Sequence, residues 1–137
     1  MDRRVVVDTD VLIDYFVGIS PSAEAIVQLL REDRLAVTAL TLFELACGAQ
    51  TPDQLHDLEL LAQAAYLVYL DGPSALQAGA VYRELRAAGQ LLETADLLIA
   101  GCCLASQLPL LTRNTEHFSR VRGLKLLEAE EILKGER

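Results

Sequence analysis

Short apolar runs alternate along the chain with longer segments in which apolar residues recur every three or four positions. The runs are four or five residues long and almost wholly apolar, as in strands of a parallel sheet that is covered on both faces. They predict strands at residues 4–8, 35–38, 66–70, 109–112 and 124–127. The segments between them have the period of helices.

The predicted helices have recognisable start signals. Each start has a side chain that can cap a helix, and the four are Ser20 before Pro21, Thr51 before Pro52, Asp71 before Pro73, and Thr94. We expect the helix after Asp71 to stop at Gly89 and the helix after Thr94 to run to about Gln107. Strands that alternate with helices predict a three-layer α/β/α sandwich with a central parallel sheet.

Length and composition favour one domain. The chain has 137 residues and contains no repeat, low-complexity segment or linker, so we expect a single domain over residues 1–137. Its longest apolar run, residues 97–105, has nine residues, whereas a membrane-spanning helix needs roughly 20. The apolar residues 5–7 are too few for a secretion signal. We therefore expect a cytoplasmic protein with no membrane partner.

Three cysteines, Cys47, Cys102 and Cys103, form no Cys-x-x-Cys pair and have no histidine close by in sequence. A zinc site is therefore not indicated. All three lie among apolar residues, so we expect them to be reduced and buried as small apolar side chains.

The charge of the chain is unevenly distributed. The net charge of −8 repels nucleic acids and other polyanions at long range. Residues 113–125, however, contain four bases and one acid, a local charge of +3. A basic patch next to acids suits an enzyme that holds phosphate, but it is equally compatible with a solvated loop that contains a few arginines.

Four polar side chains are expected near the carboxyl ends of the predicted strands, where ligands bind in open parallel sheets. Asp8 ends the first strand, and Asn114 lies just past the fourth. Glu44 lies in a helix opening, and Asp96 lies in the first turn of its own helix. Mg²⁺ and Mn²⁺ prefer carboxylate and water oxygens, and they assist hydrolysis of phosphodiesters. Without a cation, such acids would repel one another and destabilise the fold.

Each of these residues also has a purely structural interpretation. Asp8 and Asp96 are able to stabilise the start of a helix by capping or through the helix dipole. Thr41 and Glu44 have the spacing of a capping box, and Asn114 suits a turn. Taken singly, none of them decides the function.

The polar residues around these positions have open roles. Asp10 and Asp14 are expected to be solvated or to cap a helix, although Asp10 is close enough to orient its neighbour two residues earlier. Arg113 has two interpretations, a bond to substrate phosphate or an ion pair with Glu116. His117 is expected to be a turn residue.

Four segments occur in a defined order. They are Asp-Thr-Asp-Val-Leu-Ile from Asp8, Thr-Leu-Phe-Glu ending at Glu44, Glu-Thr-Ala-Asp-Leu-Leu-Ile-Ala from Glu93, and Leu-Thr-Arg-Asn-Thr-Glu-His-Phe from Leu111. Together they resemble PIN-domain ribonucleases, specifically the VapC-type toxins of type II toxin–antitoxin pairs. The resemblance spans residue 5 to about residue 132, and four motifs in order are far more specific than one.

The resemblance implies a role for each residue. Asp8 and Asp96 would be the principal ligands of Mg²⁺, for which Mn²⁺ substitutes, and Glu44 would complete the acidic pocket. Asn114 occupies a position where many relatives have aspartate, so one negative charge is missing. Thr112 would orient the attacking water or the phosphate. The implied activity is hydrolysis of RNA to a 5′-phosphate and a 3′-hydroxyl.

The resemblance also implies partners. These are a substrate RNA and a cognate antitoxin that sends a basic segment toward the acidic pocket. The chain is 52% apolar, which for its length indicates surface left for association, and we expect a homodimer.

Three other functions share part of this pattern. Asp8-x-Asp10 resembles the acidic pair of haloacid-dehalogenase-type phosphatases, but the lysine and later aspartate pair that these enzymes need are missing. A phosphoacceptor receiver domain would combine that pair with Asp71 and Lys125, but it would leave Asp96 unused. A catalytically silent PIN-like domain would only bind a partner, and the intact set of acids argues against this.

Overall fold

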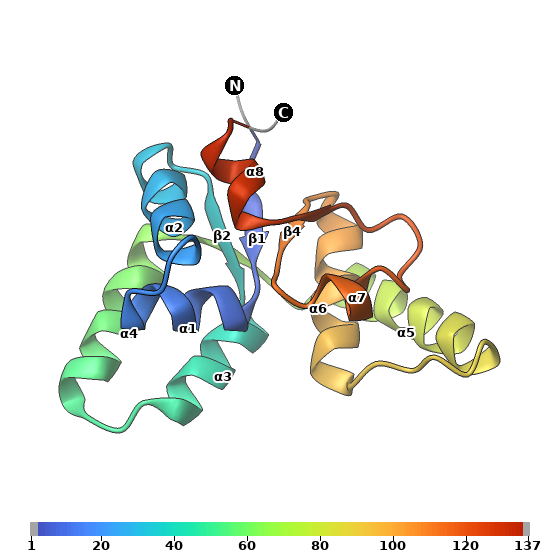
Figure 1. The fold of residues 1–137 in the computed structure, drawn as a ribbon. Helices are drawn as coiled ribbons and strands as arrows, with labels where there is room; N and C mark the ends of the chain where they lie inside the picture. The colour runs from blue at the N-terminus through green and yellow to red at the C-terminus, as the bar shows by residue number, and fades with distance from the viewer. Residues whose placement is uncertain (1–2, 136–137) are drawn as a thin grey trace.

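Five parallel strands form one sheet in the computed structural model, which describes residues 3–135 (Figure 1). The strands are β1 (Val5–Val7), β2 (Leu35–Thr38), β3 (Tyr66–Val68), β4 (Leu110–Leu111) and β5 (Leu126–Leu127), in the order β3-β2-β1-β4-β5. All five predicted strands are confirmed. Four are shorter than predicted because their end residues leave the ladder for turns and helix caps.

Helices cover both faces of this sheet, so the predicted three-layer sandwich is confirmed (Figure 1). The helices are α1 (Thr9–Val17), α2 (Ser22–Arg31), α3 (Ala39–Gly48), α4 (Pro52–Ala64), α5 (Gly72–Ala87), α6 (Thr94–Ser106), α7 (Thr115–Phe118) and α8 (Ala129–Leu133). Helices α1, α2, α4 and α8 contribute to the core on one face, and α5, α6 and α7 to the core on the other.

The strands divide their side chains between the two cores. Val5 and Val7 pack with α1 and α2, whereas Val6 packs with α5 and α6, as the two-residue period of a strand requires. Helices α5 and α6 approach closely at Gly101. A Cβ atom there would lie 2.5 Å from the Ser74 carbonyl oxygen, so only glycine allows this packing.

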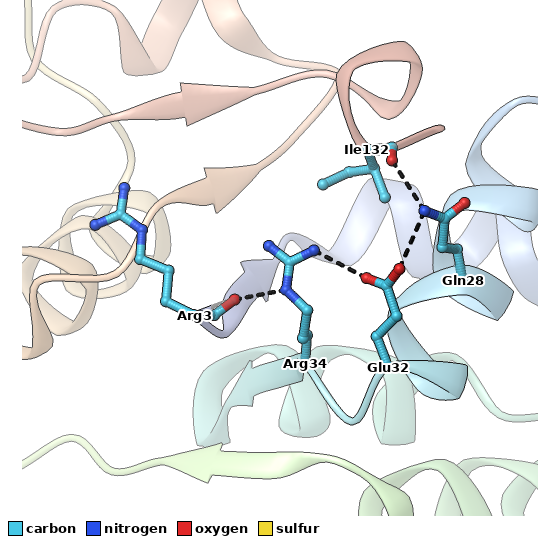
Figure 2. A network of polar contacts seen from close by, with 5 residues as sticks. All are labelled: Arg3, Gln28, Glu32, Arg34 and Ile132. Atoms are coloured by element: carbon cyan, nitrogen blue, oxygen red, sulfur yellow. Dashed lines mark hydrogen bonds and ion pairs between the residues drawn. The ribbon is translucent and has the colours of Figure 1, made fainter. Parts of the chain in front are cut away.

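A polar network at the amino ends of the strands ties distant segments together (Figure 2). Arg34 is only 5% exposed. Its Nε donates to the Arg3 carbonyl at 2.7 Å, and its Nη1 donates to Glu32 at 3.0 Å. Gln28 then donates both to Glu32 and to the carbonyl of Ile132 in α8. The network therefore joins the first strand, helix α2 and the last helix.

Two of the four predicted capping side chains are confirmed. Thr51 accepts from the Gln54 amide, and Asp71 accepts from the Ser74 amide. The prediction is wrong for Ser20, because Pro21 occupies the cap position of α2 and the Ser20 hydroxyl donates to Glu24 instead. It is also wrong for Thr94, which is the first helical residue of α6 after Glu93.

The cysteines are free, but they are not all buried. Cys102 and Cys103 lie in the core between α6 and the sheet, whereas Cys47 is exposed on α3. The expectation of burial is therefore wrong for Cys47, whose apolar sequence neighbours partly face solvent. Within residues 3–135, no helix has both the length and the apolar character needed to cross a membrane.

Candidate functional site

The strand order places the candidate site at the centre of the sheet. The connections leave β1 toward β2 and β3 on one side, and the chain then crosses to β4 and β5 on the other. Ligands of open α/β sheets bind at the carboxyl ends of the strands on either side of such a reversal. Asp8 follows β1, and Thr112 follows β4. The Thr112 hydroxyl donates to Asp8 Oδ2 at 2.8 Å and so bridges the reversal.

Asp8 has a structural role and an unusual electrostatic environment. Its Oδ1 accepts from the Thr9 amide at the start of α1, so the capping interpretation is also correct. The side chain is buried, and burial together with the charges of Asp10 and Asp96 raises its pKa from 3.8 to about 6. A cap alone does not require other carboxylates nearby.

Glu44 lies within α3 rather than at its start. Thr38 caps this helix by accepting from the Thr41 amide, so the capping-box interpretation of Glu44 is wrong. The Glu44 carboxylate instead accepts a 2.7 Å hydrogen bond from the Thr9 hydroxyl. Thr9 directly follows Asp8, so this bond links the start of α1 to the acid on α3. No sequence pattern singled out Thr9 for this contact.

Asp96 extends the group of acids from the first turn of α6. Its pKa is raised by burial and then by the charges of Glu44 and Glu93, with a further contribution from Asp10. Repulsion of this kind arises only over short distances. Helices α3 and α6 contact each other, and this packing brings Asp96 within electrostatic range of Glu44, although the two residues are 52 positions apart in the sequence.

Asn114 lies in the turn between β4 and α7. Its amide N–H donates to Thr112 at 2.9 Å, and its side-chain Nδ2 lies 3.0 Å from His117 Nδ1. His117 is exposed, and its charge lowers the pKa of Asp96. His117 is therefore a basic neighbour of the site, whereas its sequence context predicted only a turn residue.

The expectation that Asp10 and Asp14 are solvated or cap a helix is wrong, because Asp8 is the cap of α1 and both acids contact Arg113. Asp14 is 5% exposed and accepts from the Arg113 guanidinium and the Ser22 hydroxyl. Asp10 accepts from the Arg113 backbone N–H through Oδ2. The two acids are four residues apart and share one face of α1. Of the two roles considered for Arg113, the ion pair is formed with Asp14 rather than Glu116.

Two observations favour a cation among these acids. Within residues 3–135, Asp10 Oδ1 is a buried oxygen with no hydrogen-bond partner. The pKa values of Asp8, Asp10 and Asp96 are all raised, with burial as the largest cause. In the same part of the chain, no three His, Cys, Asp or Glu side chains converge into a closed metal site. The donor chemistry fits a hard divalent ion, and binding one requires the carboxylates to draw closer together.

The strand order also separates this protein from a receiver domain. Such domains have the flavodoxin-like order 2-1-3-4-5, whereas β1 here lies between β2 and β4. Asp71 follows the edge strand β3 and caps α5 with an exposed side chain. It therefore cannot join Asp8 and Asp10 in a phosphoacceptor pocket, because β2 lies between their strands.

Comparison with known proteins agrees with the geometry. The family model described as PIN domain matches residues 5–124. The protein named Ribonuclease VapC1 from Methanocaldococcus jannaschii is 31% identical over 93% of this chain and 89% of its own length. Ribonuclease VapC1 from Haemophilus influenzae strain R2866 is 32% identical over 86% of this chain and 92% of its own length.

A solved structure shows the same arrangement in three dimensions. VapBC-1 from nontypeable Haemophilus influenzae superimposes with a TM-score of 0.78 at 29% identity, over 92% of this chain and 98% of that one. The fold and the matches along nearly the whole sequence thus agree. This chain belongs to the PIN domain family, among its VapC-type proteins.

Proposed function

We propose that this protein is a metal-dependent endoribonuclease that serves as the toxin of a toxin–antitoxin pair. The observation that carries the proposal is the neighbourhood of carboxylates at the carboxyl end of β1, where the charges of Asp10 and Asp96 raise the pKa of Asp8 and the charge of Glu44 raises that of Asp96. Relatives at 31% and 32% identity, matched over most of both chains, are named ribonucleases. A chain that matches them over most of its length and has a group of acids beside the central strands is expected to hydrolyse RNA.

Asp8, Asp96 and Glu44 would hold the metal in this proposal. When bound, Mg²⁺ or Mn²⁺ would neutralise charge on the phosphodiester and promote ionisation of water. The raised pKa of Asp8 means that a cation competes with a proton for this carboxylate. Metal affinity is therefore expected to fall as the pH drops toward 6.

The other side chains of the site orient these acids. Thr112 fixes Asp8 Oδ2, and Thr9 fixes one oxygen of Glu44. Asn114 lacks the negative charge of an aspartate, so the site repels the substrate phosphate less at this position. In the reaction a water oxygen forms a bond to phosphorus, and the bond to the 3′ oxygen breaks. That oxygen gains a proton, which leaves a 3′-hydroxyl and a 5′-phosphate.

The activity is tested by incubating total bacterial RNA with antitoxin-free protein in Mn²⁺. Discrete fragments are expected from the unmodified protein, and none from Asp96→Asn or in the presence of EDTA. Asp33→Asn is the matched control, because Asp33 is exposed beyond α2 and has a positive φ that asparagine tolerates. Intact RNA from a folded, partner-free sample would instead favour a PIN-like domain that only binds.

The partner is proposed to be a small antitoxin with a basic segment. A groove of about 340 Å³ runs between α1, α3 and α4, where it is lined by apolar side chains such as Ile13, Phe16 and Leu45. Glu44 lies at the same groove. An apolar helix seated there would place a following basic side chain next to the acids.

The antitoxin proposal is tested with the product of the neighbouring gene, expected to be a short DNA-binding protein. Phe16→Glu in the groove should weaken the complex in a pull-down, while Leu133→Glu on α8, an exposed residue outside the lining of the groove, serves as the control. Unchanged binding by Phe16→Glu would exclude this groove as the antitoxin site.

A homodimer is proposed from the uncovered apolar surface. Phe43 on α3 is 67% exposed, and Leu76 on α5 is 78% exposed. Large apolar side chains so accessible to water favour association. Sedimentation at micromolar concentration is expected to give the mass of a dimer, and a monomer alone would contradict this.

A further inference from the structure

The turn of residues 112–114 holds the site together through three hydrogen bonds. The Thr112 hydroxyl binds Asp8, and the Arg113 backbone N–H binds Asp10 at 3.1 Å. The Asn114 backbone N–H binds the Thr112 hydroxyl. The turn therefore fixes one carboxylate oxygen of each of these two acids against the start of α1.

One side chain anchors the turn to the next turn of α1. Arg113 Nε lies 3.1 Å from Asp14 Oδ2, and the Asp14 side chain is 6% exposed while that of Arg113 is 59% exposed. Asp10 and Asp14 lie four residues apart on one helix face. Arg113 therefore holds both acids, Asp10 with its backbone and Asp14 with its side chain.

The surroundings of Arg113 favour anchoring over direct binding of phosphate. The small cavity beside it, of about 260 Å³, is also lined by Asp14, Glu128 and Glu130. A phosphate next to this guanidinium would face those carboxylates. Ser22 from α2 donates to the same Asp14 oxygen at 2.9 Å, so the carboxylate is fixed from both sides.

We infer that Asp14 is a positioning residue of the active site, acting through Arg113 to hold the turn of residues 112–114 against α1. The expected effect on catalysis rests on the proposed ribonuclease activity. The expected effect on the turn does not. Loss of the ion pair frees the turn, and Asp8 and Asp10 then lose their fixed orientation. The expected result is slower catalysis with little change in RNA binding.

The structural consequence is measured by NMR exchange of the Arg113 and Asn114 backbone amides in EDTA. Asp14→Asn and Arg113→Ala both keep these amides, yet exchange is expected to become roughly tenfold faster in each. Glu130→Gln is the matched control, because it removes an exposed carboxylate from the cavity beside Arg113 and leaves the Asp14 bonds in place. Exchange at the rate of the unmodified protein in Asp14→Asn would overturn the inference.

The kinetic consequence is measured on a fluorogenic RNA oligonucleotide that contains the cleavage sequence mapped from the total RNA digest. Asp14→Asn and Arg113→Ala should each lower kcat roughly tenfold, with KM changed less than about twofold. The double variant should be no slower than either single one, because both changes break one contact. Glu130→Gln should retain kcat.

The outcomes separate the inference from the proposed function. A higher KM in Arg113→Ala, with Asp14→Asn unchanged, would overturn the inference and assign Arg113 to RNA phosphate. Absence of cleavage by the unmodified protein would count against the proposed function, while the amide exchange would still decide whether Asp14 holds the turn.

Discussion

The two edges of the sheet contain charged side chains in opposite situations. At the amino edge, buried Arg34 lies between the Arg3 carbonyl and the Glu32 carboxylate, so its charge is compensated. At the carboxyl edge, buried Asp8 lies among other carboxylates, and its pKa rises to about 6. One edge joins segments of the fold, whereas the other keeps like charges together at a cost in stability.

This difference indicates where the fold is under functional constraint. A buried charge with a partner is common in stable proteins, but a group of acids with raised pKa values requires another explanation. Asp10, whose Oδ1 is buried and has no hydrogen-bond partner among residues 3–135, belongs to the carboxyl edge. Substitutions should therefore act on stability at the amino edge and on activity at the carboxyl edge.

The largest effect is expected from Asp8→Asn on activity. Removal of a proposed metal ligand should lower the rate of RNA cleavage by at least about a hundredfold. The protein should remain folded, because asparagine still accepts the Thr9 amide. The measurement is the initial rate in Mn²⁺, with Asp33→Asn as the control. Cleavage near the rate of the unmodified protein would show that Asp8 is not a metal ligand.

The next effect is expected from Arg34→Met on stability. The change removes the hydrogen bonds to Arg3 and Glu32 but keeps an apolar side chain of similar length. The free energy of unfolding should fall by about 2 kcal/mol, as for a buried group that leaves its partners unpaired. Urea denaturation measures this, with exposed Arg31→Met as the control. The cleavage rate should be retained. A matching loss of activity would contradict the assignment of the amino edge to stability and of the carboxyl edge to activity.

A pH dependence of stability should distinguish Asp8 from an ordinary carboxylate. Its folded pKa of about 6 lies above the usual 3.8, so the unfolded chain releases this proton first. Stability therefore falls as the pH rises from about 4 to about 6, and it stays lower above that window. In EDTA, Asp8→Asn should gain about 2 kcal/mol relative to the unmodified protein between these limits. Curves of stability against pH that run parallel for the two proteins would contradict a raised Asp8 pKa as the cause.

The smallest effect is expected from Asp96→Asn on stability. Burial and the charges of Glu44 and Glu93 raise the Asp96 pKa, so the ionised form is disfavoured in the folded protein. In EDTA at neutral pH the variant should be as stable as the unmodified protein, or higher in Tm by up to about 3 °C. A clear drop in Tm would instead identify Asp96 as a structural cap.

Local patterns predicted the elements well because each depends on neighbouring residues. The apolar run at 35–38 coincides with β2, and Thr51 and Asp71 cap the predicted helices. The predicted caps Ser20 and Thr94 are wrong because an adjacent residue, Pro21 or Glu93, occupies the cap position. A one-residue shift of a helix start depends on how the whole helix packs, which the local sequence does not contain.

The candidate acids were predictable, whereas the contacts that orient them were not. Motif order alone indicated Asp8, Glu44, Asp96 and Asn114. The Thr9 bond to Glu44 and the Asp14 bond to Arg113 join residues 35 and 99 positions apart. Neither pairing has a spacing rule, because loop paths and strand order bring these residues together.

The sequence by itself determined the alternation of strands and helices and the parallel sheet, since these follow from local periodicity, and the order of its motifs singled out the candidate acids. Tertiary structure alone decided that β1 and β4 are neighbours, and hence that Asp8 meets Thr112. It also decided that Asp14 is buried against Arg113 rather than solvated. The physical reason is that burial and charge proximity depend on which elements pack together, and these two factors set the pKa of Asp8.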